Sequence, residues 1–176
     1  AYVTLAMLFS AATTFTVYWL ARTLYDRFTA SAAAALLAGS PLFWFYGSVG
    51  LTYAGEAFGA SLVALLAYRT LGVKATHLYA GAVVLGLVGG MRQSVLVLLF
   101  PLWLGCALVG ARSARRLAAA GTVLAGAVLV WFLPLVWLSG GWRAYLAASI
   151  QLYGSMVLPT SVLGGDLDTT LRQTRH

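Results

Sequence analysis

Charged side chains are scarce in this sequence of 176 residues, because Asp, Glu, Lys and Arg together make up 9% of it. A soluble domain carries about 25% charged residues. Hydrophobic residues account for 61% of the chain, and its mean hydropathy is +0.89. This composition excludes a soluble globular protein, a disordered chain and a secreted disulfide scaffold. It predicts an integral membrane protein.

Cysteine and histidine are also rare. Cys106 is the single cysteine, so an internal disulfide is excluded. His77 and His176 lie far apart in the sequence and show no metal-ligand spacing. The net charge of +7 comes from basic residues that stand singly between apolar runs. That distribution favours a bilayer over nucleic acid as the partner.

Asparagine is absent, and Ile150 and Lys74 are the only residues of their types. GC-rich codons give such a bias, so we expect a bacterial source and an inner or plasma membrane location. The chain begins at Ala1 inside an apolar run, without a basic leader or a cleavage site. We therefore expect it to be a fragment of a longer protein.

Six apolar segments approach the roughly 20 residues that a spanning helix needs. They cover residues 2–20, 30–46, about 53–68, two helices within 78–109, and 117–138. The range 78–109 is too long for one crossing, so we expect it to fold back at the polar residues 89–94. Residues 142–158 alternate an aromatic-rich apolar face with a mildly polar one, which is typical of an interfacial helix.

The fold predicted from these segments is all-α, a polytopic membrane helix bundle. It comprises a bundle of about six transmembrane helices over residues 1–138, an extracytoplasmic interfacial amphipathic helix over 139–158, and a polar tail over 159–176. Spacings such as Gly55 with Gly59 and Gly86 with Gly90 favour close helix packing.

Charge placement predicts the orientation of the bundle, because cytoplasmic loops collect Lys and Arg. One set of alternate turns holds Arg22, Arg27, Arg69, Lys74, Arg112, Arg115 and Arg116. The other set holds only two basic residues, Arg92 and Arg143. We expect the first set to be cytoplasmic. Both termini would then be extracytoplasmic, on the same side as Glu56.

Glu56 is the only acidic residue within an apolar segment. An ionisable group at the centre of a span costs roughly 2.5–3.5 kcal/mol, which favours a functional role. A carboxylate at this position would orient a sugar hydroxyl, hold a divalent ion or pair with a basic group. The alternative is that Glu56 lies at the membrane interface, where the cost is small, and merely pairs with Arg92.

Arg92 precedes Gln93 and Ser94 at the expected turn between two helices. This set of donors suits a phosphate, and we expect Ser94 to cap the helix that follows. The alternative is an arginine that snorkels to the interface. Asp166 and Asp168 resemble the Asp-x-Asp pair with which soluble nucleotide-sugar transferases hold a metal, but an ordinary polar loop is the favoured interpretation.

Four stretches resemble the multi-spanning GT-C glycosyltransferases of the protein-mannosyltransferase or family 39-like kind. They are residues 40–46 (Ser-Pro-Leu-Phe-Trp-Phe-Tyr), 52–56 (Thr-Tyr-Ala-Gly-Glu), 86–92 (Gly-Leu-Val-Gly-Gly-Met-Arg) and 100–103 (Phe-Pro-Leu-Trp). The resemblance implies a bundle that moves a sugar from a polyprenyl-phosphate carrier to an acceptor on the outer side. Its partners would be membrane lipid and the polyprenyl-phosphate sugar donor.

The resemblance also implies roles for individual residues. Glu56 would position the acceptor or donor, and Arg92 would bind the lipid phosphate. Tyr53, Gln93 and Arg143 complete the expected substrate-binding set. The family's acidic catalytic or metal-binding residue lies in a first outer loop that has no counterpart in this chain. No catalytic residue or metal ligand is therefore assigned, and a need for a divalent metal stays open.

Two other classes of function compete with the enzyme. In a transporter or flippase component, Glu56 would serve as a proton or ion site. However, no repeat is visible, and Glu56 and Arg92 are expected at the outer surface rather than the midplane. In a structural membrane subunit, neither residue would carry chemistry. The sugar, the acceptor and the oligomeric state are not encoded in any motif that we recognise.

Overall fold

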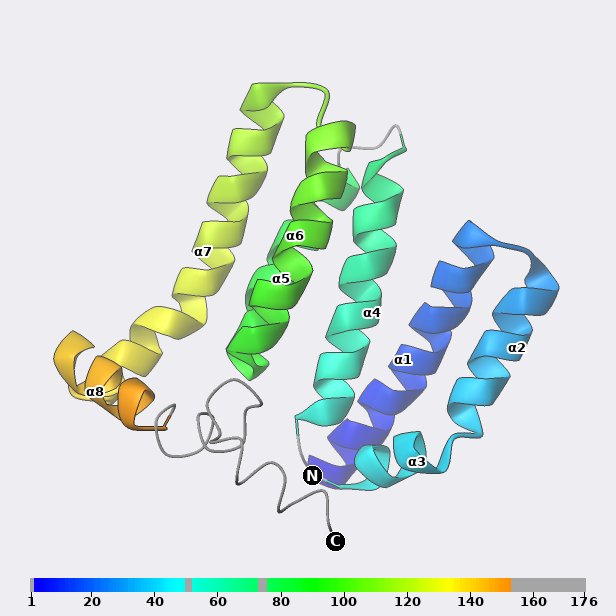
Figure 1. Ribbon diagram of the computed structural model, residues 1–176, viewed down its shortest axis with the longest axis horizontal. Coiled ribbons are helices and arrows are strands. Elements are labelled where there is room, and N and C mark those ends of the chain that lie inside the picture. The colour runs from blue at the N-terminus through cyan, green and yellow to red at the C-terminus, as the bar shows by residue number, and fades with distance from the viewer. Residues whose placement is uncertain (1, 50–51, 73–75, 153–176) are drawn as a thin grey trace, which may run out of the picture. The chain divides into compact units, whose positions relative to one another are not determined.

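The computed structural model describes residues 2–49, 52–72 and 76–152, and this part of the chain is helical throughout, without a strand (Figure 1). The helices are α1 (Tyr2–Leu24), α2 (Arg27–Ala38), α3 (Pro41–Ser48), α4 (Tyr53–Thr70), α5 (Thr76–Met91), α6 (Gln93–Gly110), α7 (Ala114–Leu138) and α8 (Trp142–Leu152). The chain forms two compact units, Ala1–Trp131 and Phe132–His176. The all-α prediction is confirmed for the described residues.

Three helices, α1, α6 and α7, are long and apolar enough to cross a membrane. If the bent pair α2 and α3 forms one span, the number is four. Helix α5 is apolar but has only 16 residues. Within the described ranges, the fold is thus an all-helical one with three or four candidate spans. The expected six crossings stay a prediction.

The expected single helix over residues 30–46 is wrong, because the chain breaks there into α2 and α3 with a bend of 59°. Gly39 ends α2, and Ser40 caps α3 by accepting a hydrogen bond from the backbone N–H of Phe43 at 3.5 Å. Pro41 follows in the first turn of α3. Because proline disfavours helical backbone at the residue before it, Ser40 is extended and α3 starts in a new direction.

The fold-back within residues 78–109 is confirmed. Helices α5 and α6 meet at Arg92 and run antiparallel. At one end of the pair, Gly89 faces Leu96. At the other, the buried Trp103 indole donates to the carbonyl of Leu78 over 3.4 Å. This antiparallel pair packs against α4.

The core of the first unit is built from α4, α5, α6 and the first part of α7. Its buried members are Val63, Leu78, Ala82, Leu85, Trp103, Ala107, Ala111, Ala120 and Leu124. Glycines bring these helices close together. A Cβ at Gly59 would overlap Val88, and one at Gly90 would lie 2.8 Å from the ring of Trp131. The expected close packing at these small residues is confirmed.

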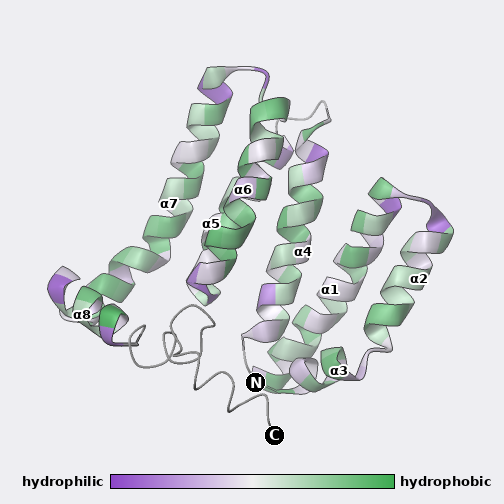
Figure 2. Cartoon of the chain, in the orientation of Figure 1, coloured by the Kyte–Doolittle hydropathy of each residue, from purple (hydrophilic) through white to green (hydrophobic). Residues whose placement is uncertain are grey.

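Charge is segregated between the two ends of the first unit (Figure 2). Basic residues occupy the α1–α2 turn, the last turn of α4 and the α6–α7 turn, whereas Glu56 is in the first turn of α4. The alternation read from the sequence is confirmed for these turns. The side of the membrane that each end faces stays a prediction.

Helix α8 belongs to the second unit. There Phe132 contacts the rings of Trp142 and Tyr145, with centroids 6.1 and 5.7 Å away. The remainder of the expected interfacial helix, the polar tail with Asp166 and Asp168, and Lys74 lie outside the described residues. The interfacial location of α8 stays a prediction.

We expect Gly110→Ala to lower the free energy of unfolding by about 1–3 kcal/mol, because its new methyl group would overlap the backbone carbonyl of Thr70, which cannot move aside. Gly105→Ala is the matched control on the same helix, since nothing lies within 4 Å of its Cβ position. That control should be neutral or stabilising through helix propensity. Thermal unfolding in detergent measures both. Equal shifts would contradict the close contact of α4 and α6.

Candidate functional site

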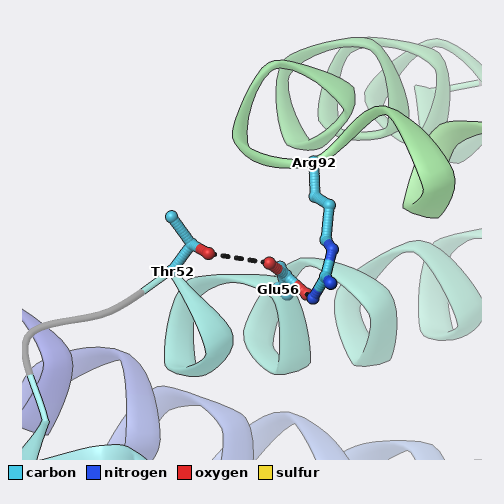
Figure 3. Close-up of polar contacts among 3 residues, drawn as sticks. All are labelled: Thr52, Glu56 and Arg92. Carbon is cyan, nitrogen blue, oxygen red and sulfur yellow. Dashed lines mark hydrogen bonds and ion pairs between the residues drawn. The ribbon is translucent and has the colours of Figure 1, made fainter. Parts of the chain in front are cut away.

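An ion pair joins Glu56 and Arg92 (Figure 3). It lies at the end of the first unit opposite to the basic turns. Nη1 of Arg92 donates to Oε2 of Glu56 at 3.2 Å. The other carboxylate oxygen, Oε1, accepts a hydrogen bond from the hydroxyl of Thr52 at 2.8 Å. Both oxygens of Glu56 are therefore engaged, and the carboxylate has a fixed orientation.

The two partners differ in exposure. The side chain of Glu56 is 13% exposed, whereas that of Arg92 is 51% exposed. The hydrogen bond and the charge of Glu56 raise the pKa of Arg92 above its ordinary value. The pair thus consists of a largely buried anion and a cation that reaches the surface.

Local structure explains how the sequence brings these residues together. Glu56 lies in the first turn of α4, where the positive end of the helix dipole favours a carboxylate. Thr52 directly precedes α4, four residues before Glu56, so both project from one turn. Arg92 has extended backbone at the break between α5 and α6. The packing of Gly59 against Val88 holds α4 and α5 close enough for the two charges to meet.

Two tyrosines extend the site. The guanidinium carbon of Arg92 lies 5.5 Å from the centre of the Tyr53 ring, within the range of a cation–π interaction. The ring of Tyr46, on α3, packs against Tyr53 with centroids 4.7 Å apart. The site therefore joins three parts of the chain, namely α3, the start of α4 and the α5–α6 break.

Tyr46 and Tyr53 also line a cavity of about 260 Å³ among α1, α2, α3 and α4. The other lining residues are mostly small or apolar, and they are Ser10, Leu37, Ser40, Leu42, Phe43, Gly47, Ala54 and Ala57. Tyr53 thus contacts the guanidinium of Arg92 and also lines the cavity. This arrangement suits a ligand with an anionic group and an apolar chain.

The chemistry open to the site follows from its hydrogen bonds. A guanidinium carries five N–H donors in a planar fork, more than one carboxylate oxygen uses, so Arg92 can bind a second anion beside Glu56. Glu56 accepts hydrogen bonds from Thr52 and Arg92, so it is suited to orienting the guanidinium of Arg92. The described residues contain no group of three or more His, Cys, Asp or Glu that could hold a metal.

The structure brings three of the five expected binding residues together, namely Tyr53, Glu56 and Arg92. Gln93 follows as the exposed first residue of α6. Arg143 is exposed on α8 in the second unit, and its assignment to this site stays a prediction.

The expected cap by Ser94 is wrong. Arg92 occupies the N-cap position of α6, one residue before the helix begins, and makes no side-chain cap hydrogen bond. Sequence reasoning also missed Thr52 and Tyr46. The i, i+4 spacing of Thr52 and Glu56 was a usable signal. Tyr46 had none, because its position depends on the bend before α3.

Comparison of the chain with protein-family models, with curated proteins and with solved structures finds no match. The function of the site therefore has to be argued from its own geometry.

We expect an asymmetric double-mutant cycle for the ion pair. Arg92→Gln leaves a largely buried carboxylate without its cation, so it should lower the midpoint of thermal unfolding more than Glu56→Gln, which leaves a half-exposed arginine in solvent. Adding Glu56→Gln to Arg92→Gln should restore part of the loss. Glu56→Gln combined with Arg115→Gln, an exposed arginine on α7, is the control and should be additive. Additive effects in both pairs would contradict the pairing.

Proposed function

We propose that this protein is an integral membrane glycosyltransferase of the GT-C kind, which transfers a sugar from a polyprenyl-phosphate carrier to an extracytoplasmic acceptor. One observation carries the proposal: Tyr53 contacts both the half-exposed guanidinium of Arg92 and the apolar cavity. A polyprenyl-phosphate sugar has a phosphate for the cation and an isoprenoid chain for the cavity. The site supplies one partner for each.

The residues have distinct roles in this proposal. Arg92 binds the phosphate and stabilises the negative charge that develops on it when the bond to the sugar breaks. Glu56 is a positioning residue. One of its carboxylate oxygens holds the guanidinium of Arg92 against Tyr53, and the other oxygen accepts a hydrogen bond from Thr52. Gln93 and Arg143 are proposed as further contacts to the donor or acceptor.

The proposal includes a membrane topology. The bundle crosses a bacterial inner membrane six times, the basic turns face the cytoplasm, and α8 lies in the outer interface. The Glu56–Arg92 end then opens to the extracytoplasmic side, where the acceptor is. The group that activates the acceptor is not among the residues assigned here.

A transporter is the second candidate, and the break between α2 and α3 favours it. Broken helices line the binding sites of many transporters, usually near the bilayer midplane. The bend of 59° between α2 and α3 is a helix break of this kind. However, Glu56 lies in the first turn of α4 rather than at its middle. The position of the ion pair at one end of the bundle therefore favours the enzyme.

Binding of a short polyprenyl phosphate tests the site directly. Farnesyl phosphate should bind the protein in nanodiscs more tightly than farnesol, which has the same chain without the phosphate. Arg92→Gln should weaken farnesyl phosphate binding by about 10-fold or more, since a charge-assisted hydrogen bond is lost, and should leave farnesol binding unchanged. Arg92→Lys should restore part of the affinity. Quenching of intrinsic fluorescence reports both ligands.

The cavity has its own control pair in this assay. Ala57→Leu fills part of the cavity and should weaken both ligands, whereas Ala118→Leu, at an exposed position on α7, should weaken neither. Equal affinity of the wild-type protein for farnesyl phosphate and farnesol would overturn the phosphate role of Arg92.

Transfer of a labelled sugar tests the reaction. In membranes from cells that express the full gene, a polyprenyl-phosphate sugar donor should label an acceptor, and Arg92→Gln should lower kcat/KM by about 10²–10³-fold, as loss of a charge-stabilising donor does. Thr52→Val should have a smaller effect, mainly on KM. Transfer at the wild-type rate by Arg92→Gln membranes would refute the enzyme proposal. Loss of ion-coupled flux in Glu56→Gln vesicles, without any transfer activity, would favour the transporter.

A further inference from the structure

Six arginines lie at the end of the first unit away from the Glu56–Arg92 site. Figure 2 shows hydrophilic residues in the turns at this end. They are Arg22 and Arg27 at the α1–α2 turn, Arg69 in the last turn of α4, and Arg112, Arg115 and Arg116 at the α6–α7 turn. We call this group the basic end. Four of its members are exposed, and the other two are partly exposed.

Contacts between helices connect the three segments of the basic end. Arg69 lies over the ring of Trp19, with its guanidinium carbon 6.0 Å from the centroid, which ties the end of α4 to that of α1. Gly110, at the end of α6, packs directly against the backbone of Thr70. The α6–α7 turn therefore starts beside the end of α4. The arginines of all three segments therefore lie at one end of the first unit.

This positive surface is not neutralised within the described part of the chain. Among the described residues the structure records an ion pair between Glu56 and Arg92, and this pair lies at the opposite end of the first unit. The basic end contains one carboxylate, Asp26, which accepts a hydrogen bond from the backbone N–H of Thr29 at 3.1 Å and caps α2. Hydrogen bonding by the side chain and then the backbone N–H of Thr29 lowers the pKa of Asp26 below its ordinary value. Six positive charges thus face one negative charge that is already engaged.

The α6–α7 turn carries three of the six positive charges of the basic end. Arg115 and Arg116 are in the first turn of α7, where the helix dipole favours anions and disfavours cations. The helix leads directly into a candidate span of 25 residues. A phosphate at this turn would be attracted by the arginine side chains and, in addition, by the dipole of α7.

We infer that the basic end binds the phosphate headgroups of anionic membrane lipids. Its charge is opposite to theirs, and it lies where candidate spans α1, α6 and α7 begin or end, at the level of a lipid headgroup layer. Juxtamembrane arginines attract anionic lipids in proportion to their number. The inference is independent of the proposed glycosyltransferase activity, because it involves none of the residues of that site.

Lipid selection by the purified protein tests this inference. The full chain is reconstituted in nanodiscs of phosphatidylcholine with a minor share of phosphatidylglycerol, and the enrichment of phosphatidylglycerol around the protein is measured by native mass spectrometry. The wild-type protein should enrich phosphatidylglycerol. The triple variant Arg112→Gln, Arg115→Gln, Arg116→Gln should reduce the relative affinity by at least roughly 10-fold. Added salt should weaken the enrichment.

A charge-matched variant separates a local surface from net charge. The matched pair of double variants is Arg115→Gln with Arg116→Gln, at the basic end, and Arg172→Gln with Arg175→Gln, elsewhere in the chain. The first should lower the enrichment, and the second, which removes the same number of charges, should keep it. Absence of enrichment in the wild-type protein, or equal loss in the two double variants, would overturn the inference. Inorganic phosphate is added as a separate probe, and full displacement of the lipid by millimolar phosphate would identify a soluble-anion site instead. Loss of sugar transfer in Arg92→Gln would not affect any of these outcomes.

Discussion

A largely buried carboxylate in an apolar helix is the constraint on which the candidate site depends. Glu56 is 13% exposed, and a charge with so little access to water needs partners for both of its oxygens. Arg92 and Thr52 provide them. Because Arg92 comes from a distant part of the sequence, the ion pair requires that the start of α4 and the α5–α6 break be placed together.

Close helix packing makes that meeting possible. Gly59 leaves room for Val88, so α4 and α5 approach until the two charges are within 3.2 Å. The bend before α3 then directs Tyr46 against Tyr53, which in turn contacts Arg92. Three local features produce these contacts. They are a small residue on α4, the helix break at Arg92, and a proline that follows the cap of α3. Together they place a cation at the edge of an apolar cavity.

The two ends of the bundle have different electrostatic character. At one end, the arginine is paired and oriented by Glu56, which suits selective recognition of a single anion. At the other, several arginines share a surface that contains one engaged carboxylate, Asp26, which suits many anions at once. The same residue type therefore supports two kinds of interaction, and the ratio of arginines to carboxylates at each end decides which.

The sequence alone determined the helical class, the fold-back within residues 89–94 and the separation of charge between alternate turns. It also offered the pairing of Glu56 with Arg92 as an alternative interpretation. These features depend on local composition, chain length and charge order, which one sequence displays. The bend of α2 and α3, the contacts of Thr52 and Tyr46 and the cavity were decided only by tertiary structure. The physical reason is that helices such as α4 and α5 are apolar on nearly every side, so hydrophobic periodicity does not reveal which face packs against which neighbour.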